Sequence, residues 1–294
     1  MIGPSTSKHK FIIFFILVFS FLFSYGSGGI EPNNVINTLT LKIKAKVAQY
    51  PNLVCGVCIK PSWLPEGKST ININGNSAFP AASLIKIPIA VVLLRKIDKG
   101  QISWGQILTL KQNHYAQGAG YLRTNKAGTK IKLKEVFKLM LTISDNTACN
   151  MIIDFLGGVN AVNKQIAELG LKNTKVKNYL GDFKGTNKTS PYDLVTILEK
   201  SLEGDLLSSS SQRLLKSTLL KVNNSSLANR GLGMDVKFAH KTGTIGICVG
   251  DAGIVYLPLW KRIKMAIIVK RPFNSLQGKE IIKEISKLVY EYLG

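Results

Sequence analysis

The sequence predicts an α+β fold, in which an antiparallel sheet is flanked by helices and interrupted by an all-α insertion. Three observations support it. Strand patterns occur near both ends of the chain, the C-terminal strands are joined by short turns, and the middle has helical periodicity. Strands at both ends with helices between them indicate one sheet built from the two terminal parts of the chain.

The N-terminal part contains a helix, two strands and then a second helix. Amphipathic spacing predicts the first helix over 33–49, and strands follow at 53–60 and 69–74 with a turn rich in proline and glycine between them. The next helix runs over 83–99. It is apolar on nearly all sides, so we expect it to be buried at the centre of the fold.

The rest of the chain is first helical and then mostly strand. The predicted helices are 131–142, 145–156, 159–169, 191–203 and 209–220. An aperiodic loop spans 173–190. The last elements are strands at 236–244, 249–257 and 262–270 and a helix at 276–293. We expect an α/β domain formed by 33–82 and 205–294, a mainly helical domain at 83–204, and an active site between them.

Residues 1–26 have the pattern of a signal peptide. Lys8 and Lys10 precede an apolar run over 11–23, which is shorter than the roughly 20 residues that a membrane span needs. Small residues then precede a cleavage site that we expect near Gly26. The sequence therefore predicts export to the periplasm or the exterior, with an uncleaved anchor as the alternative.

Charge and composition argue against nucleic-acid binding. The formal net charge is +22, but the basic residues are scattered and mostly lysine. A solvated basic surface explains this pattern, and loose attraction to an anionic cell envelope is the alternative. The histidines show no metal-ligand spacing, so we predict neither a metal nor another cofactor.

The four cysteines do not form an evident redox or zinc motif. Cys55 and Cys58 lie in a predicted buried strand, where residues three apart face opposite sides of the sheet. We therefore expect them to be buried as small apolar residues. A disulfide is the alternative in an exported protein, although no pairing follows from the sequence.

Ser83 and Lys86 have the spacing of a nucleophile and its base. Residues three apart on a helix share one face, so the amine can reach the hydroxyl. Lysine can act as a base if burial and a nearby positive charge lower its pKa, and Lys241 would supply that charge. Because Ser83 begins the predicted helix, its N–H is free to bind an oxyanion.

Two rarer motifs follow in order along the chain. Ser-x-x-Lys alone is weak evidence, since about one copy is expected by chance in a chain of this length. Ser144-Asp145-Asn146 and Lys241-Thr242-Gly243 are much rarer strings. The ordered trio therefore indicates acyl transfer to a serine.

With these motifs, the chain resembles the class A serine β-lactamases, a family of penicillin-recognising serine hydrolases. The likeness extends from about residue 33 to the end, and its specific parts are 79–86, 139–148, 240–244 and 251–255. It implies a β-lactamase/transpeptidase-like fold.

The resemblance also implies roles for the motif residues. Ser83 would attack the lactam carbonyl, Lys86 would take its proton directly or through water, and Ser144 would pass a proton to the departing nitrogen. Lys241 would stabilise the substrate carboxylate and tune Ser144. The implied substrate-binding residues are Asn146, Thr242, Gly243 and Thr244. The N–H groups of Ser83 and Thr244 would form the oxyanion hole, while Asp145 would cap the following helix.

One segment departs from the family pattern. Class A enzymes carry Glu-x-x-Leu-Asn in a loop where the glutamate activates the hydrolytic water. The corresponding stretch here, 175–191, contains no glutamate and has Asp182 as its one carboxylate. Asp182 is a candidate deacylation base, and a turn residue after Gly181 is the alternative. Acylation is thus better supported than turnover.

The leading hypothesis is a monomeric enzyme that hydrolyses a small β-lactam through an acyl-enzyme on Ser83. A D-alanyl-D-alanine peptidase, transpeptidase or esterase would use the same acylation residues on a D-Ala-D-Ala-like or ester substrate. The third reading is a non-hydrolytic protein that binds penicillin or wall peptide.

Overall fold

The computed structural model describes residues 32–65, 69–233 and 236–294. The predicted signal peptide at 1–26 lies outside these residues. Within them, no helix is long and apolar enough to cross a membrane.

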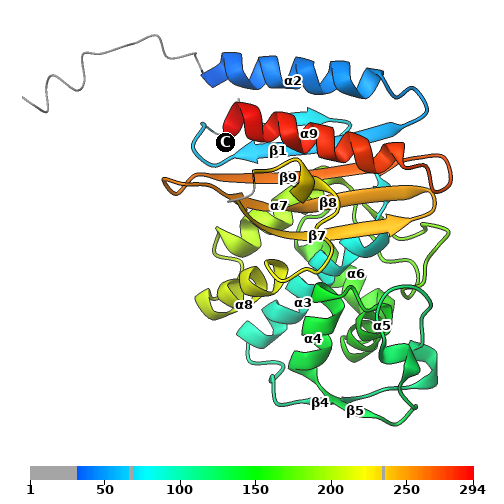
Figure 1. The fold of residues 1–294 in the computed structure, drawn as a ribbon. Coiled ribbons are helices and arrows are strands. Elements are labelled where there is room, and N and C mark those ends of the chain that lie inside the picture. The colour runs from blue at the N-terminus through cyan, green and yellow to red at the C-terminus, as the bar shows by residue number, and fades with distance from the viewer. Residues whose placement is uncertain (1–31, 66–68, 234–235) are drawn as a thin grey trace, which may run out of the picture.

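A five-stranded antiparallel sheet forms the upper part of the molecule in Figure 1, with the strand order β2-β1-β9-β8-β7. Strands from the N-terminal part are β1 (Val54–Pro61) and β2 (Ile71–Ile73). The C-terminal part supplies β7 (Lys237–Ile245), β8 (Cys248–Tyr256) and β9 (Arg262–Lys270). The central pairing of β1 with β9 joins the two ends of the chain, which confirms the predicted sheet.

Helices cover both faces of this sheet. The outer face carries α2 (Pro32–Ala48) and α9 (Gln277–Leu293), which lie side by side. The inner face packs on α7 (Pro191–Leu202) and on the helical part of the molecule. Cys55 belongs to the outer apolar cluster and Cys58 to the inner one, so the predicted opposite orientation is confirmed. All four cysteines are buried and free.

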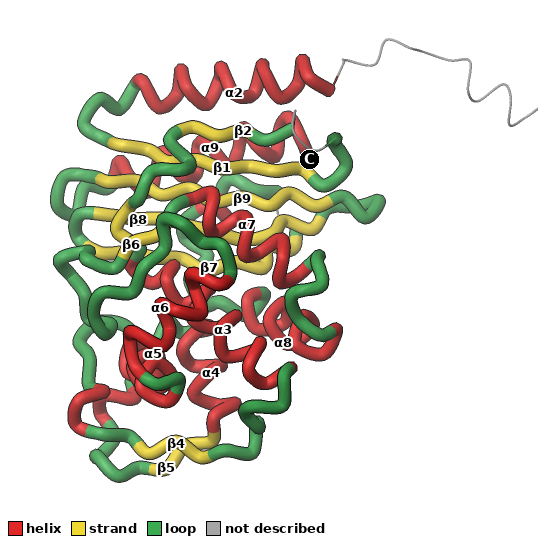
Figure 2. The backbone as a smooth tube through the Cα atoms, turned by 180° about the vertical axis from the view of Figure 1, so that it is seen from behind, coloured by secondary structure: helices red, strands yellow, loops and turns green. Residues whose placement is uncertain are grey.

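The helical part surrounds α3 (Lys86–Asp98), whose residues from Lys86 to Leu94 are all buried. This confirms the predicted central helix. Around it, as Figure 2 shows from behind, lie α4 (Leu133–Thr142), α5 (Asn146–Phe155), α6 (Gly158–Glu168) and α8 (Ser209–Leu219). Side-chain caps fix where three of the helices begin: Asp145 for α5, Ser190 for α7 and Ser208 for α8.

The structure corrects the predicted start of the central helix. Ser83 lies in the 3₁₀ turn η1 (Ala82–Ile85), and the α-helix begins only at Lys86. Ala82 has a φ of 44°, a left-handed backbone that would break a continuous helix before Ser83. The i,i+3 spacing still brings Ser83 and Lys86 together, because such residues eclipse each other in a 3₁₀ turn.

Several short elements were not predicted. They are the strand pairs β3 (Phe79–Pro80) with β6 (Lys188–Thr189) and β4 (Ile107–Thr109) with β5 (Lys130–Lys132), and the 3₁₀ turns η2 (Gln112–His114), η3 (Leu122–Thr124) and η4 (Ala228–Arg230). Two or three residues are too few for periodicity to be visible in a sequence. The pairing of β3 with β6 matters for function, because it fixes the end of the 173–190 loop next to η1.

Candidate active site

Gly243 allows the turn that carries Ser83 to pack against the edge strand β7. A Cβ atom at Gly243 would lie 3.0 Å from Leu84 Cγ and 3.1 Å from the backbone nitrogens of Leu84 and Ser83. Any larger residue would therefore push η1 away from β7. The glycine serves the packing of the protein backbone here, as well as the expected approach of a substrate.

Lys86 is the centre of the polar network. Its side chain is fully buried, and Nζ lies 3.1 Å from Ser83 Oγ, 3.1 Å from Ser144 Oγ, 2.7 Å from Ser144 O and 2.7 Å from Asn146 Oδ1. The expected proximity of Ser83 and Lys86 is thus present. Burial lowers the pKa of Lys86 to about 8, against the opposing effects of Cys149 and Asp145.

The second motif forms the strained link between α4 and α5. Ser144 has a φ of 60°, which turns its carbonyl and hydroxyl oxygens to Lys86. Asp145 caps α5 by accepting from the Ala148 N–H at 2.8 Å. The other oxygen of Asp145 accepts from the backbone N–H groups of Tyr121 and Leu122. The predicted capping role of Asp145 is confirmed, and it also holds the 118–122 segment in place.

Asn146 joins the network to the same segment. Its side-chain oxygen accepts from Lys86, while its amide nitrogen donates to Gln117 O at 2.8 Å. This arrangement determines the amide's orientation. One side of the Asn146 amide faces the lysine, and the residue also lines the pocket beside Ser83.

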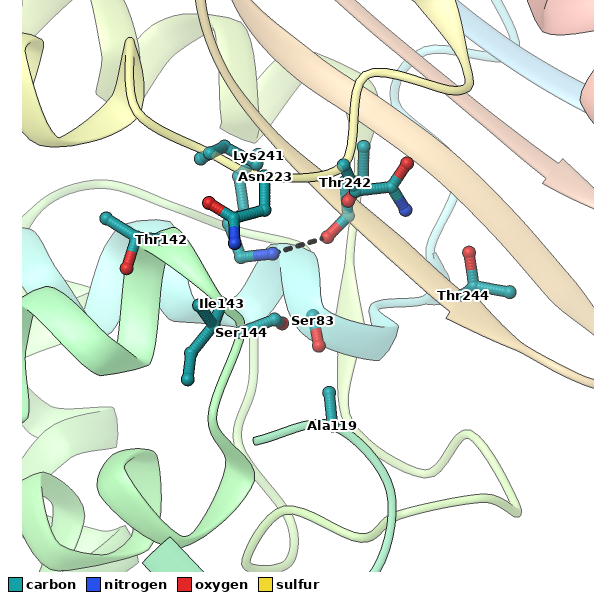
Figure 3. A pocket seen from close by; sticks show the side chains of 11 residues that line it. Ser83, Ala119, Thr142, Ile143, Ser144, Asn223, Lys241, Thr242 and Thr244 are labelled. Carbon is teal, nitrogen blue, oxygen red and sulfur yellow. Dashed lines mark hydrogen bonds between the residues drawn. The ribbon is translucent and has the colours of Figure 1, made fainter. Parts of the chain in front are cut away.

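Lys241 reaches the site from β7. Its side chain is buried, and Nζ donates to Thr242 O at 2.8 Å, the dashed line in Figure 3. Burial and the neighbouring Lys86 charge lower the pKa of Lys241 well below its ordinary value. The structure therefore brings the two buried amines of the motifs into electrostatic contact.

The pocket has two adjoining parts that share Ser83, Ala119 and Thr244. Ser144, Lys241 and Thr242 line the first part, and the Ser144 side chain points towards Ser83 (Figure 3). Asn146 lines the second part together with residues 180–183 of the loop. Every residue proposed from the motifs to bind or react thus lines the pocket, apart from Lys86 beneath it and Gly243 behind η1.

The 173–190 loop brings Leu180 into the part of the pocket that Ser83 and Asn146 also line. Asn150 on α5 grips the loop at that point: its Oδ1 accepts from Leu180 N at 2.6 Å, and its Nδ2 donates to Leu180 O at 3.2 Å. The sequence analysis did not single out Leu180. The one feature of the sequence that could have drawn attention to Leu180 is its apolar side chain within a mostly polar, aperiodic loop.

Asp182 also lines this part of the pocket, but both of its oxygens bind the loop itself. Oδ1 accepts from Thr186 Oγ1 at 2.8 Å and Oδ2 accepts from Asn187 N at 2.7 Å. These bonds are those of a turn residue, the alternative given above for Asp182.

The segment 222–224 was missed entirely. These residues follow α8 and line the first part of the pocket opposite Ser144, next to Thr142 and Ile143. The Asn223 N–H donates to Thr142 O at 3.0 Å, which attaches the segment to the end of α4. A run of asparagines and serines predicts only a loop, so nothing in the sequence indicated its position.

Within the described residues, no cluster of His, Cys, Asp or Glu could hold a metal ion.

A protein-family model described as the Beta-lactamase enzyme family matches residues 38–293. The chain belongs to this family. The match confirms the resemblance to class A serine β-lactamases, the expected fold and the prediction of a class A-like serine hydrolase.

Individual relatives agree with the family assignment. Extended-spectrum beta-lactamase PER-1 of Pseudomonas aeruginosa is 26% identical over 247 residues, which cover 78% of this chain and 80% of PER-1. The solved structure of PBP-A is 41% identical, with a TM-score of 0.83 over 86% of this chain and 95% of PBP-A. A mutant of PBP-A, solved as an acyl-enzyme complex with penicillin G, has 41% identity and a TM-score of 0.84, over 87% and 96% of the two chains.

Proposed function

We propose that the protein opens β-lactam rings by forming an acyl-enzyme on Ser83, with Lys86 as the general base. The observation that carries this proposal is the position of the buried Lys86 amine, 3.1 Å from both serine hydroxyls. A lysine with a pKa of about 8 is substantially unprotonated at mildly alkaline pH and can accept the Ser83 proton directly.

The other pocket residues complete the acylation step. Ser144 lies within hydrogen-bond distance of the same amine, so it can deliver a proton to the lactam nitrogen as that bond breaks. Lys241, Thr242 and Thr244 line the same pocket, so we assign the binding of the substrate carboxylate to the Lys241 amine and the two threonine hydroxyls. Because β7 is an edge strand, alternate N–H groups along it have no strand partner on the outer side. We assign the oxyanion hole to the N–H groups of Thr244 and Ser83.

Hydrolysis of the acyl-enzyme is the slow step in this proposal. A deacylating water needs a base within hydrogen-bond reach. Leu180 has no such group, and Asp182 uses both oxygens to hold its own loop. We therefore expect rapid acylation followed by slow release of the product.

The carboxylate-poor loop also favours a second candidate, a D-alanyl-D-alanine peptidase or transpeptidase. Such an enzyme would acylate on the same serine and would hold penicillin as a long-lived adduct. The likeness to PBP-A, whose mutant was solved as a penicillin G acyl-enzyme, is consistent with it.

Two measurements test these proposals. A fluorescent penicillin should label the purified protein covalently at one site, and Ser83→Ala should abolish the label. Absence of label on the unaltered protein would refute both candidates. Hydrolysis of a chromogenic cephalosporin should show a burst of one equivalent followed by slow turnover. A stable adduct with no turnover at all, together with cleavage of a D-Ala-D-Ala peptide, would favour the second candidate.

We also propose that the protein is exported to the periplasm or the exterior and acts as a monomer. The signal-peptide pattern of residues 1–26 supports this location. The predicted division into an α/β domain and a helical domain is retained as a proposal, with the pocket between η1, β7 and the link from α4 to α5.

A further inference from the structure

The turn between β8 and β9 exposes two large apolar side chains. Leu259 is 84% exposed and Trp260 is 90% exposed, the highest values for large apolar side chains among the described residues. Neither belongs to an apolar cluster of the fold. Their exposure therefore has no explanation in the packing of this molecule.

Leu259 and Trp260 are also unusual residues for the backbone conformation of this turn. Leu259 has a φ of 56° and Trp260 a φ of 60°, and the turn is closed by the bond from Leu257 N to Lys261 O at 2.9 Å. Hairpin turns with two consecutive positive φ angles strongly prefer Asn-Gly, since bulky residues are strained there. Strained backbone positions cluster at functional sites.

Basic side chains surround the base of the turn. They are Lys216, Lys237, Lys261 and Arg262. Lys216 and Arg262 both lie over the ring of Tyr256, with Lys216 Nζ 3.8 Å from the ring centroid. The nearby acid, Glu203, is already paired with Lys264 at 3.0 Å and with Arg262 at 3.2 Å. Excess positive charge thus lies directly behind the apolar tip.

The turn lies at the end of the molecule where the chain enters the fold. In Figures 1 and 2, the start of α2 and the β8–β9 turn are at the same end of the sheet. The strand register places the β8–β9 turn beside the end of β1, because Pro61, the last residue of β1, pairs with Ile263.

We propose that the 257–261 turn binds the surface of an anionic lipid bilayer. Trp260 and Leu259 would enter the boundary between head groups and acyl chains, where Trp is favoured, and Lys216, Lys237 and Lys261 would contact lipid phosphates. Apolar insertion and electrostatic attraction are each weak alone but together give stable, salt-sensitive binding. The proposal depends on export, and it is independent of the chemistry at Ser83.

The test measures whether the exported protein sediments together with lipid vesicles. Intact mass first establishes the N-terminus of the protein. Vesicles of phosphatidylglycerol and phosphatidylcholine in equal parts are compared with vesicles of pure phosphatidylcholine. We expect binding to the anionic vesicles, weakened by salt, and quenching of Trp fluorescence by brominated acyl chains. The pair Leu259→Asn and Trp260→Gly should reduce partitioning by about a hundredfold, because each of the two large apolar side chains contributes about tenfold.

The variants are chosen so that misfolding cannot imitate the result. Asn-Gly suits this turn, so that variant should keep its thermal stability and its labelling by penicillin. Phe273→Ser with Leu276→Ser removes similarly exposed side chains, 77% and 71%, beyond the other end of β9, and should bind vesicles normally. The proposal is overturned if the unaltered protein does not bind, if it binds neutral vesicles equally well, or if the two variants behave alike.

Discussion

At the scale of single residues, the function depends on one buried amine with four acceptors. A charged Lys86 amine has three N–H donors, but four oxygen atoms lie within hydrogen-bond distance of it. They are one oxygen each from Ser83 and Asn146 and two from Ser144. When the amine is neutral, one of the two serine hydroxyls can reverse its hydrogen bond and donate to the single lone pair of Lys86. The site can therefore satisfy either protonation state of Lys86.

This arrangement predicts a pH dependence. The unprotonated amine is the base, and burial lowers its pKa to about 8, so the acylation rate should rise as pH increases through about 8 and then level off. Stopped-flow labelling with penicillin between neutral and alkaline pH measures it. A rate that is flat across this range would contradict the assignment of Lys86.

Removing the amine should be severe. Lys86→Ala should slow acylation by about 1,000-fold, within the usual range for a general base. Lys134→Ala, which removes an exposed lysine from α4, is the matched control and should react normally. Comparable rates for the two variants would exclude Lys86 as the base.

The position of Leu180 predicts a gain of function. Leu180→Glu places a carboxylate in the pocket beside Ser83, so we expect deacylation to accelerate by about 100-fold. Decay of the penicillin adduct, followed by intact mass, measures this rate.

Asp182→Asn should leave the decay of the penicillin adduct unchanged and instead destabilise the loop, because Oδ1 and Oδ2 of Asp182 accept hydrogen bonds from Thr186 and Asn187. An Asp182→Asn adduct that never decays would show that Asp182 is the base.

At the scale of elements, the close packing of η1 on β7 sets the geometry of the nucleophile. Gly243→Ala would bring a methyl group to 3.0 Å from Leu84, which should cost about 1–3 kcal/mol of stability and displace Ser83. Thermal unfolding and acylation rates should both decline. Gly105→Ala meets nothing nearer than 3.7 Å and serves as the control. Equal melting temperatures for the two variants would refute the packing argument.

The long elements were predictable and the short ones were not. Periodicity predicted α3, α5 and the C-terminal strands because each has at least nine residues with a consistent apolar pattern. The 3₁₀ turn that holds Ser83 depends on the left-handed Ala82, which no periodicity reveals. Likewise, the motifs identified the reactive residues, whereas Leu180 and the 222–224 segment reach the pocket through tertiary contacts with Asn150 and Thr142.

At the scale of the whole molecule, two apolar clusters on opposite faces of the sheet contain the thiols. Burial raises the pKa of Cys55, Cys58, Cys149 and Cys248 to about 12 in each case. Iodoacetamide should therefore leave the native protein unmodified and should add four groups after denaturation without reductant. Mass spectrometry counts the groups. Fewer than four in the denatured protein would reveal a disulfide.

The pairing of β1 with β9 has a consequence for how this protein is made. Its register joins Val54 to Lys270, so the two paired strands are far apart in the sequence. Such distant contacts delay folding, because the loop between them must close first. The sheet therefore cannot close until β9 (Arg262–Lys270) has been synthesised, so a nascent chain without that strand holds β1 without its central partner.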